Sequence, residues 1–199
     1  MGQQLLQQAS ADRFGDAGWT IDSAGTRIPG PWPIHPHAAT VLTRRLGHVA
    51  PHTSQALSRT LVGAADLVLT ASRRQRGIVV SAVPAAMGRA FTIRQFARLV
   101  DAVATPPPGG LPTDPAEQGR WLLTEAKLAR SSLQPVPGDQ EDLPDPMGGS
   151  LADFELCADR LQDAIDRILR PLAPEPTIST APADPTSPTS PTSPTSPTS

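Results

Sequence analysis

The order of strand and helix patterns along the chain predicts an α/β protein, in which helices cover both faces of a doubly wound parallel sheet. The nearly continuous apolar run over 66–71 is typical of a strand that is covered on both faces. An alternating run over 19–24 ends before Gly25 and indicates a second strand followed by a turn. Helical patterns separate these runs, as a parallel sheet requires.

The first third of the chain begins with a Gln- and Leu-rich helix over 2–13, which glycines 15 and 18 end. The strand over 19–24 follows. Residues 27–37 contain several prolines and form a restricted loop. Pro36 suits the first turn of a helix that runs to residue 47. A further helical turn is expected over 60–65.

After the strand over 66–71, Ser72 can cap a helix over 73–81. A short strand over 90–93, a helix over 94–103 and a helix over 119–130 follow, with loops over 104–115 and 131–149. Ser150 caps the last helix, over 150–170. Its apolar positions recur every three or four residues: Leu151, Phe154, Cys157, Leu161, Ile165 and Ile168.

Composition divides the chain into one domain over 1–170 and a tail over 171–199. The sequence has 199 residues and 24 prolines, and it ends in consecutive Pro-Thr-Ser triplets. These triplets offer no apolar surface to offset the entropy of ordering, so we expect the tail to be disordered.

Charge and cysteine content exclude several classes of protein. A net charge of -2 argues against a general nucleic-acid binder. The single cysteine excludes a disulfide framework and a cysteine-based metal site. The four histidines lack an accompanying cluster of ligands, so no metal is expected. No signal peptide or membrane span is visible, which predicts a cytoplasmic protein that makes no membrane contact. The sequence does not specify an oligomeric state.

Four motifs in order resemble the low-molecular-weight protein-tyrosine phosphatases. Residues 21–26 (Ile-Asp-Ser-Ala-Gly-Thr) resemble the family's strand and Ser-Ala-Gly-Thr turn, and 33–38 (Pro-Ile-His-Pro-His-Ala) resemble the loop before a helix. Residues 66–70 resemble its third strand. Asp145-Pro146 resembles the loop that carries the general acid. The resemblance covers about residues 1–170 and implies a flavodoxin-like fold. It also implies an enzyme that acts on phosphotyrosine proteins or other aryl phosphates and needs no cofactor.

The resemblance assigns three candidate site residues. Asp145 would be the general acid and base, and otherwise is a turn aspartate before a proline. Trp32 would stack on a flat phenolic substrate, and otherwise packs in the core or on the surface. Ser23 would hydrogen-bond to the nucleophile loop, and otherwise caps a turn at the end of a strand. Met147 stands where relatives often carry an aromatic residue.

One part of the family signature is missing. The family's nucleophile loop, Cys-x5-Arg-Ser/Thr, follows its first strand, whereas the 199 residues contain no such motif. Cys157 is followed six residues later by Asp163 and lies on an apolar helix face, so we expect a buried structural cysteine. Residues 1–6 (Met-Gly-Gln-Gln-Leu-Leu) resemble the family's helix just after the loop. We therefore expect either a start codon placed too far downstream or a truncated gene.

Two functions follow from this interpretation. If the natural protein carries the loop, it hydrolyses phosphotyrosine or another aryl phosphate through a cysteinyl-phosphate intermediate. The alternative is an inactive truncated remnant or a non-catalytic binding module. Arsenate reduction on the same fold is disfavoured because it would need several thiols. Loss of the family's first strand, which is central in the sheet, predicts an unstable chain or direct pairing of 19–24 with 66–71.

Overall fold

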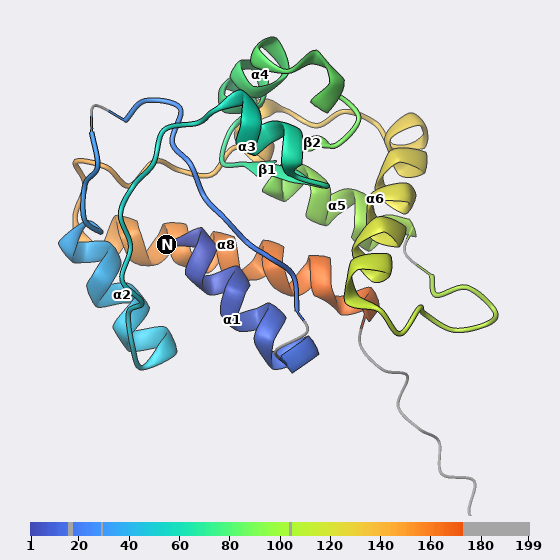
Figure 1. The fold of residues 1–199 in the computed structure, drawn as a ribbon, viewed down its shortest axis with the longest axis horizontal. Coiled ribbons are helices and arrows are strands. Elements are labelled where there is room, and N and C mark those ends of the chain that lie inside the picture. The colour runs from blue at the N-terminus through green and yellow to red at the C-terminus, as the bar shows by residue number, and fades with distance from the viewer. Residues whose placement is uncertain (16–17, 29, 104, 173–199) are drawn as a thin grey trace, which may run out of the picture.

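The computed structural model describes residues 1–15, 18–28, 30–103 and 105–172. Three helices lie together along one side of the molecule: α1 (Gly2–Phe14), α2 (Pro36–Leu46) and α8 (Leu151–Leu169). Both α1 and α2 contact α8 (Figure 1). The tail predicted to be disordered, 171–199, lies outside the described residues except for 171 and 172.

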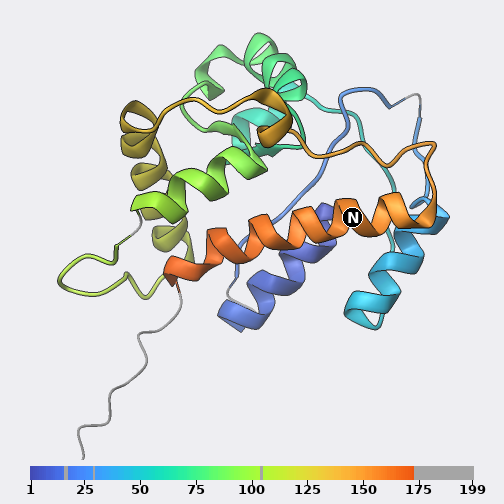
Figure 2. The same ribbon diagram turned by 180° about the vertical axis from the view of Figure 1, so that it is seen from behind.

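The sheet consists of two parallel strands, β1 (Val68–Thr70) and β2 (Ala90–Thr92), with Leu69 opposite Phe91. Helices α4 (Arg73–Ala82) and α5 (Ile93–Val103) contact both strands. The strands lie between these helices in both ribbon views (Figures 1 and 2). The predicted α/β class with a parallel sheet and helices on both faces is therefore confirmed.

The remaining elements complete the chain between these parts. Helix α6 (Pro115–Ser132) packs on α5. The short helices are α3 (Arg59–Ala64), η2 (Pro84–Ala86), α7 (Gly138–Glu141) and η3 (Arg170–Leu172). Helix α6 begins earlier than the sequence predicted because Asp114 caps it, accepting from the backbone N–H groups of residues 116 and 117.

Two predicted helix starts are confirmed in detail. The Ser72 hydroxyl accepts a hydrogen bond from the backbone N–H of Gln75 at the start of α4. Pro36 occupies the first turn of α2, which ends at Gly47 with a φ of 76°. A residue other than glycine adopts such a left-handed backbone only with strain, which explains why the helix ends there.

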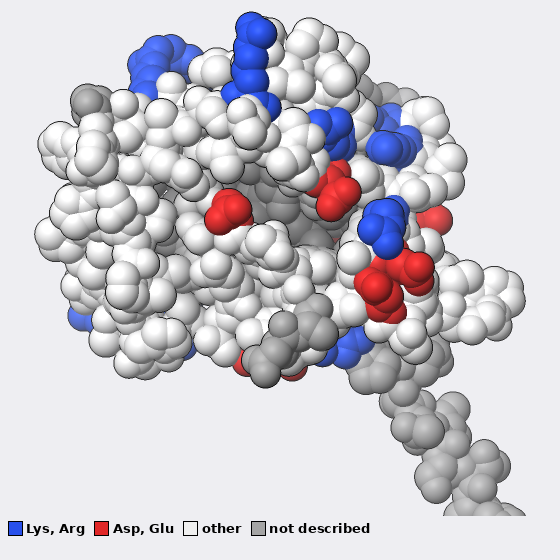
Figure 3. All heavy atoms as spheres, in the orientation of Figure 1, with Lys and Arg blue, Asp and Glu red and all other residues white. Residues whose placement is uncertain are grey.

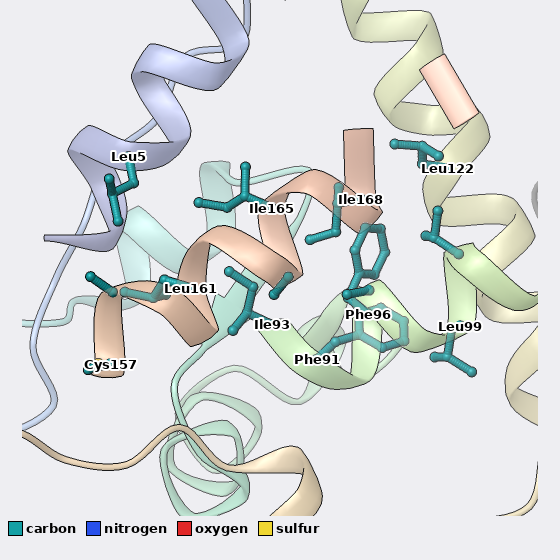
Figure 4. Packing of buried hydrophobic residues seen from close by; sticks show 14 of the residues in the cluster. Leu5, Phe91, Ile93, Phe96, Leu99, Leu122, Cys157, Leu161, Ile165 and Ile168 are labelled. Atoms are coloured by element: carbon teal, nitrogen blue, oxygen red, sulfur yellow. The ribbon is translucent and has the colours of Figure 1, made fainter. Parts of the chain in front are cut away.

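The core is built mainly from helices. Phe91 and Phe96 lie at its centre with ring centroids 5.3 Å apart, and both side chains are fully buried. Leu161 and Ile165 of α8 pack toward the same interior as Leu5 of α1 (Figure 4). Every predicted apolar position of α8 is buried except Leu151, which is half-buried.

Three expectations about the strands were wrong. Residues 19–24 form no strand, since the described part of the chain gives them no neighbouring strand to pair with. Side chains bind this segment instead: the amides of Gln3 and Gln7 donate to the carbonyl of Ile21. Direct pairing with β1 is thereby also excluded within these residues. The run over 66–71 is not covered on both faces, because Val68 and Leu69 are only half-buried.

Candidate active site

The loop that carries Asp145 is attached to the carboxyl end of β1. The backbone N–H of Leu143 donates to the carbonyl of Ala71 at 2.8 Å. The guanidinium of Arg94, in the first turn of α5, donates to the carbonyl of Asp142 at 3.1 Å. In doubly wound proteins ligands bind outside the carboxyl ends of the strands. The loop therefore lies at the edge of the sheet where a substrate site is expected.

Asp145 is exposed on this loop and is held by its neighbours in sequence. Its carboxylate accepts a hydrogen bond from the backbone N–H of Met147 at 3.0 Å, and Pro144 and Pro146 flank it. Proline fixes φ, so two flanking prolines limit the backbone freedom of the aspartate. A carboxylate accepts several hydrogen bonds, and one bond leaves capacity to bind a proton or a substrate oxygen.

The charges of the Asp145 carboxylate and of the Met1 amino group both affect the pKa of one buried residue, Cys157. Burial raises the pKa of the Cys157 thiol; the nearby N-terminal amino group of Met1 opposes this increase and the Asp145 carboxylate adds to it. The Cys157 side chain is 5% exposed and belongs to the core, as the sequence predicted.

The start of α1 is a helix end that no side chain caps. Its first backbone N–H groups have no intrahelical acceptors and, together with the helix dipole, favour an anion. Ser23 lies beside this turn, because its hydroxyl donates to the Gln3 side chain at 2.5 Å. Gln3, whose amide also donates to the carbonyl of Ile21, was not among the predicted site residues, because no local sequence signal shows a contact between residues this far apart.

Trp32 lies on the proline-rich loop, with its side chain 61% exposed. Two hydrogen bonds to Ser54 fix its backbone. The Ser54 hydroxyl accepts from the backbone N–H of Trp32 at 2.9 Å, and the backbone N–H of Ser54 donates to the Trp32 carbonyl at 2.9 Å. The indole is thus available to solvent. The three candidate residues bind different partners, namely Met147, Gln3 and Ser54, and within the described part of the chain no hydrogen bond joins one of them to another.

His35 and His37 form a ring cluster with Phe154 at the beginning of α8. The His35 and Phe154 rings are stacked, with centroids 4.6 Å apart, and His37 meets Phe154 edge-on. His35 Nδ1 accepts from the backbone N–H of His37, which caps α2. No three His, Cys, Asp or Glu side chains are grouped as metal ligands in the part of the chain that the structure describes.

A hollow separates the two halves of this face. In the space-filling view the surface is hollowed in its middle, where the ribbon places residues 18–25 on one side and β1 on the other (Figures 1 and 3). Among the described residues β1 has one strand neighbour, β2. Its other edge therefore presents backbone groups that a further strand could pair with.

Comparison with known proteins supports the fold. No family model matches the sequence, and no curated protein does. Three solved structures are similar. The YwlE arginine phosphatase from Geobacillus stearothermophilus has a TM-score of 0.58 at 22% identity and covers 86% of this chain and 82% of its own. A low-molecular-weight protein-tyrosine phosphatase from T. tengcongensis has a TM-score of 0.58 at 21% identity and covers 85% and 87%. Vibrio vulnificus Wzb, solved with benzylphosphonate, has a TM-score of 0.54 at 19% identity and covers 83% and 84%.

The chain therefore has the fold of the low-molecular-weight protein-tyrosine phosphatases, and the resemblance inferred from its motifs is confirmed at the level of the fold. A search of the described helices finds none that is long and apolar enough to cross a membrane.

Proposed function

We propose that this chain forms the acid-bearing part of a phosphatase that hydrolyses aryl phosphate monoesters, phosphotyrosine included. The observation that supports the proposal is the attachment of the Asp145 loop at the carboxyl end of β1, together with the uncapped start of α1. The first supplies a proton donor and the second supplies an anion site, at the end of the sheet where this fold binds ligands.

The reaction divides into two displacements. A thiolate attacks phosphorus, so that a sulfur–phosphorus bond forms while the bond from phosphorus to the aryl oxygen breaks. Asp145 gives its proton to the departing oxygen. Water then attacks the cysteinyl phosphate, Asp145 takes up a proton from that water, and inorganic phosphate leaves with release of the thiolate. The exposed indole of Trp32 would stack on the aryl group.

The nucleophile must come from outside these 199 residues, because they contain no Cys-x5-Arg motif. The uncovered edge of β1 and the hollow beside it would accept a strand that leads into such a loop.

Fragment complementation tests the proposal directly. The chain is mixed with a synthetic peptide that carries a β-strand followed by Cys-x5-Arg-Ser, and hydrolysis of p-nitrophenyl phosphate is measured. We expect hydrolysis with an initial burst from the phosphoenzyme. A peptide with serine in place of the cysteine should give none.

Variants assign the acid. Asp145→Asn should lower kcat by about 10²- to 10⁴-fold, the usual contribution of a general acid. Asp159→Asn, a surface change on α8 where the residue pairs with Arg45, should leave kcat unchanged.

A phosphoarginine peptide tests the other substrate class, because the similar structure from Geobacillus stearothermophilus is described as an arginine phosphatase. If the Cys-x5-Arg-Ser peptide binds to the chain and neither p-nitrophenyl phosphate nor the phosphoarginine peptide is hydrolysed, the chain is a non-catalytic binding module.

A further inference from the structure

A basic pocket lies on the other side of the Asp145 loop, between α5, α8 and residues 133–141. Its volume is about 270 Å³, and five residues line it: Arg94, Arg98, Val136, Gln140 and Arg167. Three of the five are arginines and none is acidic. Figure 2 shows α5 and α8 on this side of the molecule, with the loop above them. A pocket of this size is near the lower end of small-molecule sites, which are about 300–1,000 Å³.

Each of the three arginines has partners within the protein. Arg98 pairs with the buried Glu141 at 3.3 Å, and Arg94 donates to the carbonyl of Asp142. Arg167 pairs with Asp101 at 3.2 Å, and Asp101 is shared with Arg170. A guanidinium has five N–H donors. The buried Nε of Arg98 has no hydrogen-bond partner within the described residues, although buried donors are nearly always satisfied.

Further positive charge surrounds the same acid. Burial lowers the pKa of the Arg76 guanidinium, repulsion from Arg130 lowers it further, and Glu141 opposes both effects. Glu141 is buried, with 6% of its surface exposed, and it pairs with Arg98. Glu141 thus acts on Arg98 and Arg76, while Arg167 pairs with Asp101 and with Asp163 at 3.8 Å.

A second surface depression is lined by carboxylates as well as arginines, and it serves as a comparison. It has a volume of about 310 Å³ and is lined by two arginines and two carboxylates, together with Val41. Arg44 pairs with Glu155 and Arg45 with Asp159, so each cation has its own anion. No carboxylate is among the five residues that line the basic pocket, whereas two line this depression.

We propose that the basic pocket binds a phosphate group, either free inorganic phosphate or the phosphate of a larger molecule. Arg94 and Arg98 lie one turn apart on α5 and face the same ligand, while Arg167 approaches from α8. Paired N–H donors of guanidinium groups match the oxygens of phosphate. Because Arg94 also holds the carbonyl of Asp142, an anion in this pocket fixes the beginning of the loop that carries Asp145. The pocket does not depend on the proposed phosphatase reaction.

The test uses the 199-residue chain and titration with inorganic phosphate at constant ionic strength, followed by calorimetry. Arg167→Gln is the informative variant, because Arg170 still pairs with Asp101 in its absence. Arg98→Gln is avoided because it would leave the buried Glu141 unpaired. We expect phosphate to bind about tenfold or more weakly to Arg167→Gln, which corresponds to the loss of one charge-assisted hydrogen bond.

Two comparisons make the result decisive. Arg44→Gln, from the balanced depression, removes the same charge and should bind phosphate as the unchanged chain does. A sugar phosphate titrated in parallel distinguishes the two sources of the group: tighter binding than inorganic phosphate identifies a phosphorylated molecule as the ligand. Equal affinity of the Arg167→Gln and Arg44→Gln variants, or no saturable binding of either ligand to the unchanged chain, would overturn the proposal.

Discussion

The Cys157 thiol should react slowly, because α8 places it in the core. Its side chain is 5% exposed, and burial raises the pKa of the thiol. A raised pKa lowers the fraction of thiolate at neutral pH, and only the thiolate reacts readily. We therefore expect Ellman's reagent to modify the native chain at least about tenfold more slowly than the chain unfolded in guanidinium chloride.

The measurement has no ambiguity of assignment, since the sequence contains one cysteine. Rapid modification of the native chain would show that Cys157 is accessible and ionised, and it would reopen the role of this thiol in catalysis. The replacement Cys157→Ser should also leave the activity of the complemented enzyme in place, because the proposed nucleophile lies on the added peptide.

At the scale of single residues, the sequence predicted burial better than it predicted contacts. The spacing of apolar residues placed Cys157 in the core correctly, because a helix repeats every 3.6 residues. The sequence could not reveal that Gln3 binds Ser23 or that Glu141 pairs with Arg98, because these contacts join residues from separate elements. The roles of Asp145, Ser23 and Trp32 remain predictions, and the experiments above test the first of them.

Helix α8 begins with a capping arrangement that stabilises it in a pH-dependent manner. The Asp153 carboxylate accepts hydrogen bonds from the hydroxyl and from the backbone N–H of Ser150, both at 2.7 Å. The hydroxyl bond and then the backbone bond lower the pKa of Asp153 below its ordinary value of 3.8. A carboxylate with a lowered pKa stabilises the folded state above 3.8, and this contribution is lost as the pH falls through the folded-state pKa.

We therefore expect Asp153→Asn to reduce the free energy of unfolding at neutral pH, and the difference from the unchanged chain to shrink as the solution is acidified below pH 3.8. Chemical denaturation at several pH values measures this difference. Asp166→Asn is the matched control, because a carboxylate in the last turn of α8 opposes the helix dipole and its removal should not destabilise the chain. A difference for Asp153→Asn that stays constant with pH would contradict the argument.

At the scale of elements, the main helices and two of the three predicted strands are present, whereas the strand predicted over 19–24 is not. A helix forms its hydrogen bonds within one segment, so local residues such as the Ser72 cap and Pro36 in the first turn mark its start, although the Asp114 cap of α6 was missed. A strand depends on a neighbour that the local pattern does not show. The alternation over 19–24 is real, yet without a paired strand among the described residues the segment binds the side chains of Gln3, Gln7 and Gln55 instead.

At the scale of the whole molecule, the buried side chains form two clusters of unequal size. The larger one joins α1, α2, α5, α6 and α8 around Phe91 and Phe96. The smaller one contains four buried residues from α3, α4, η2 and β2: Val62, Val79, Ala86 and Ala90. Stability in a folded protein varies with the local density of buried contacts. The part of the molecule that includes α3 and α4 should therefore open at a lower free energy than the helical layer.

Native-state hydrogen exchange at low denaturant concentration measures this difference. We expect the amides of α4 to exchange through a partial opening, while those of α5 and α8 exchange only with global unfolding. Val79→Ala should speed exchange in α4 and leave α8 nearly unchanged, because Val79 is buried only in the smaller cluster. The loop with Asp145 is attached to Ala71, next to β1, so the same opening would release the proposed acid from the sheet edge. If α4 and α8 exchange with equal free energies, the two clusters open together, and Asp145 is as firmly held as the core itself.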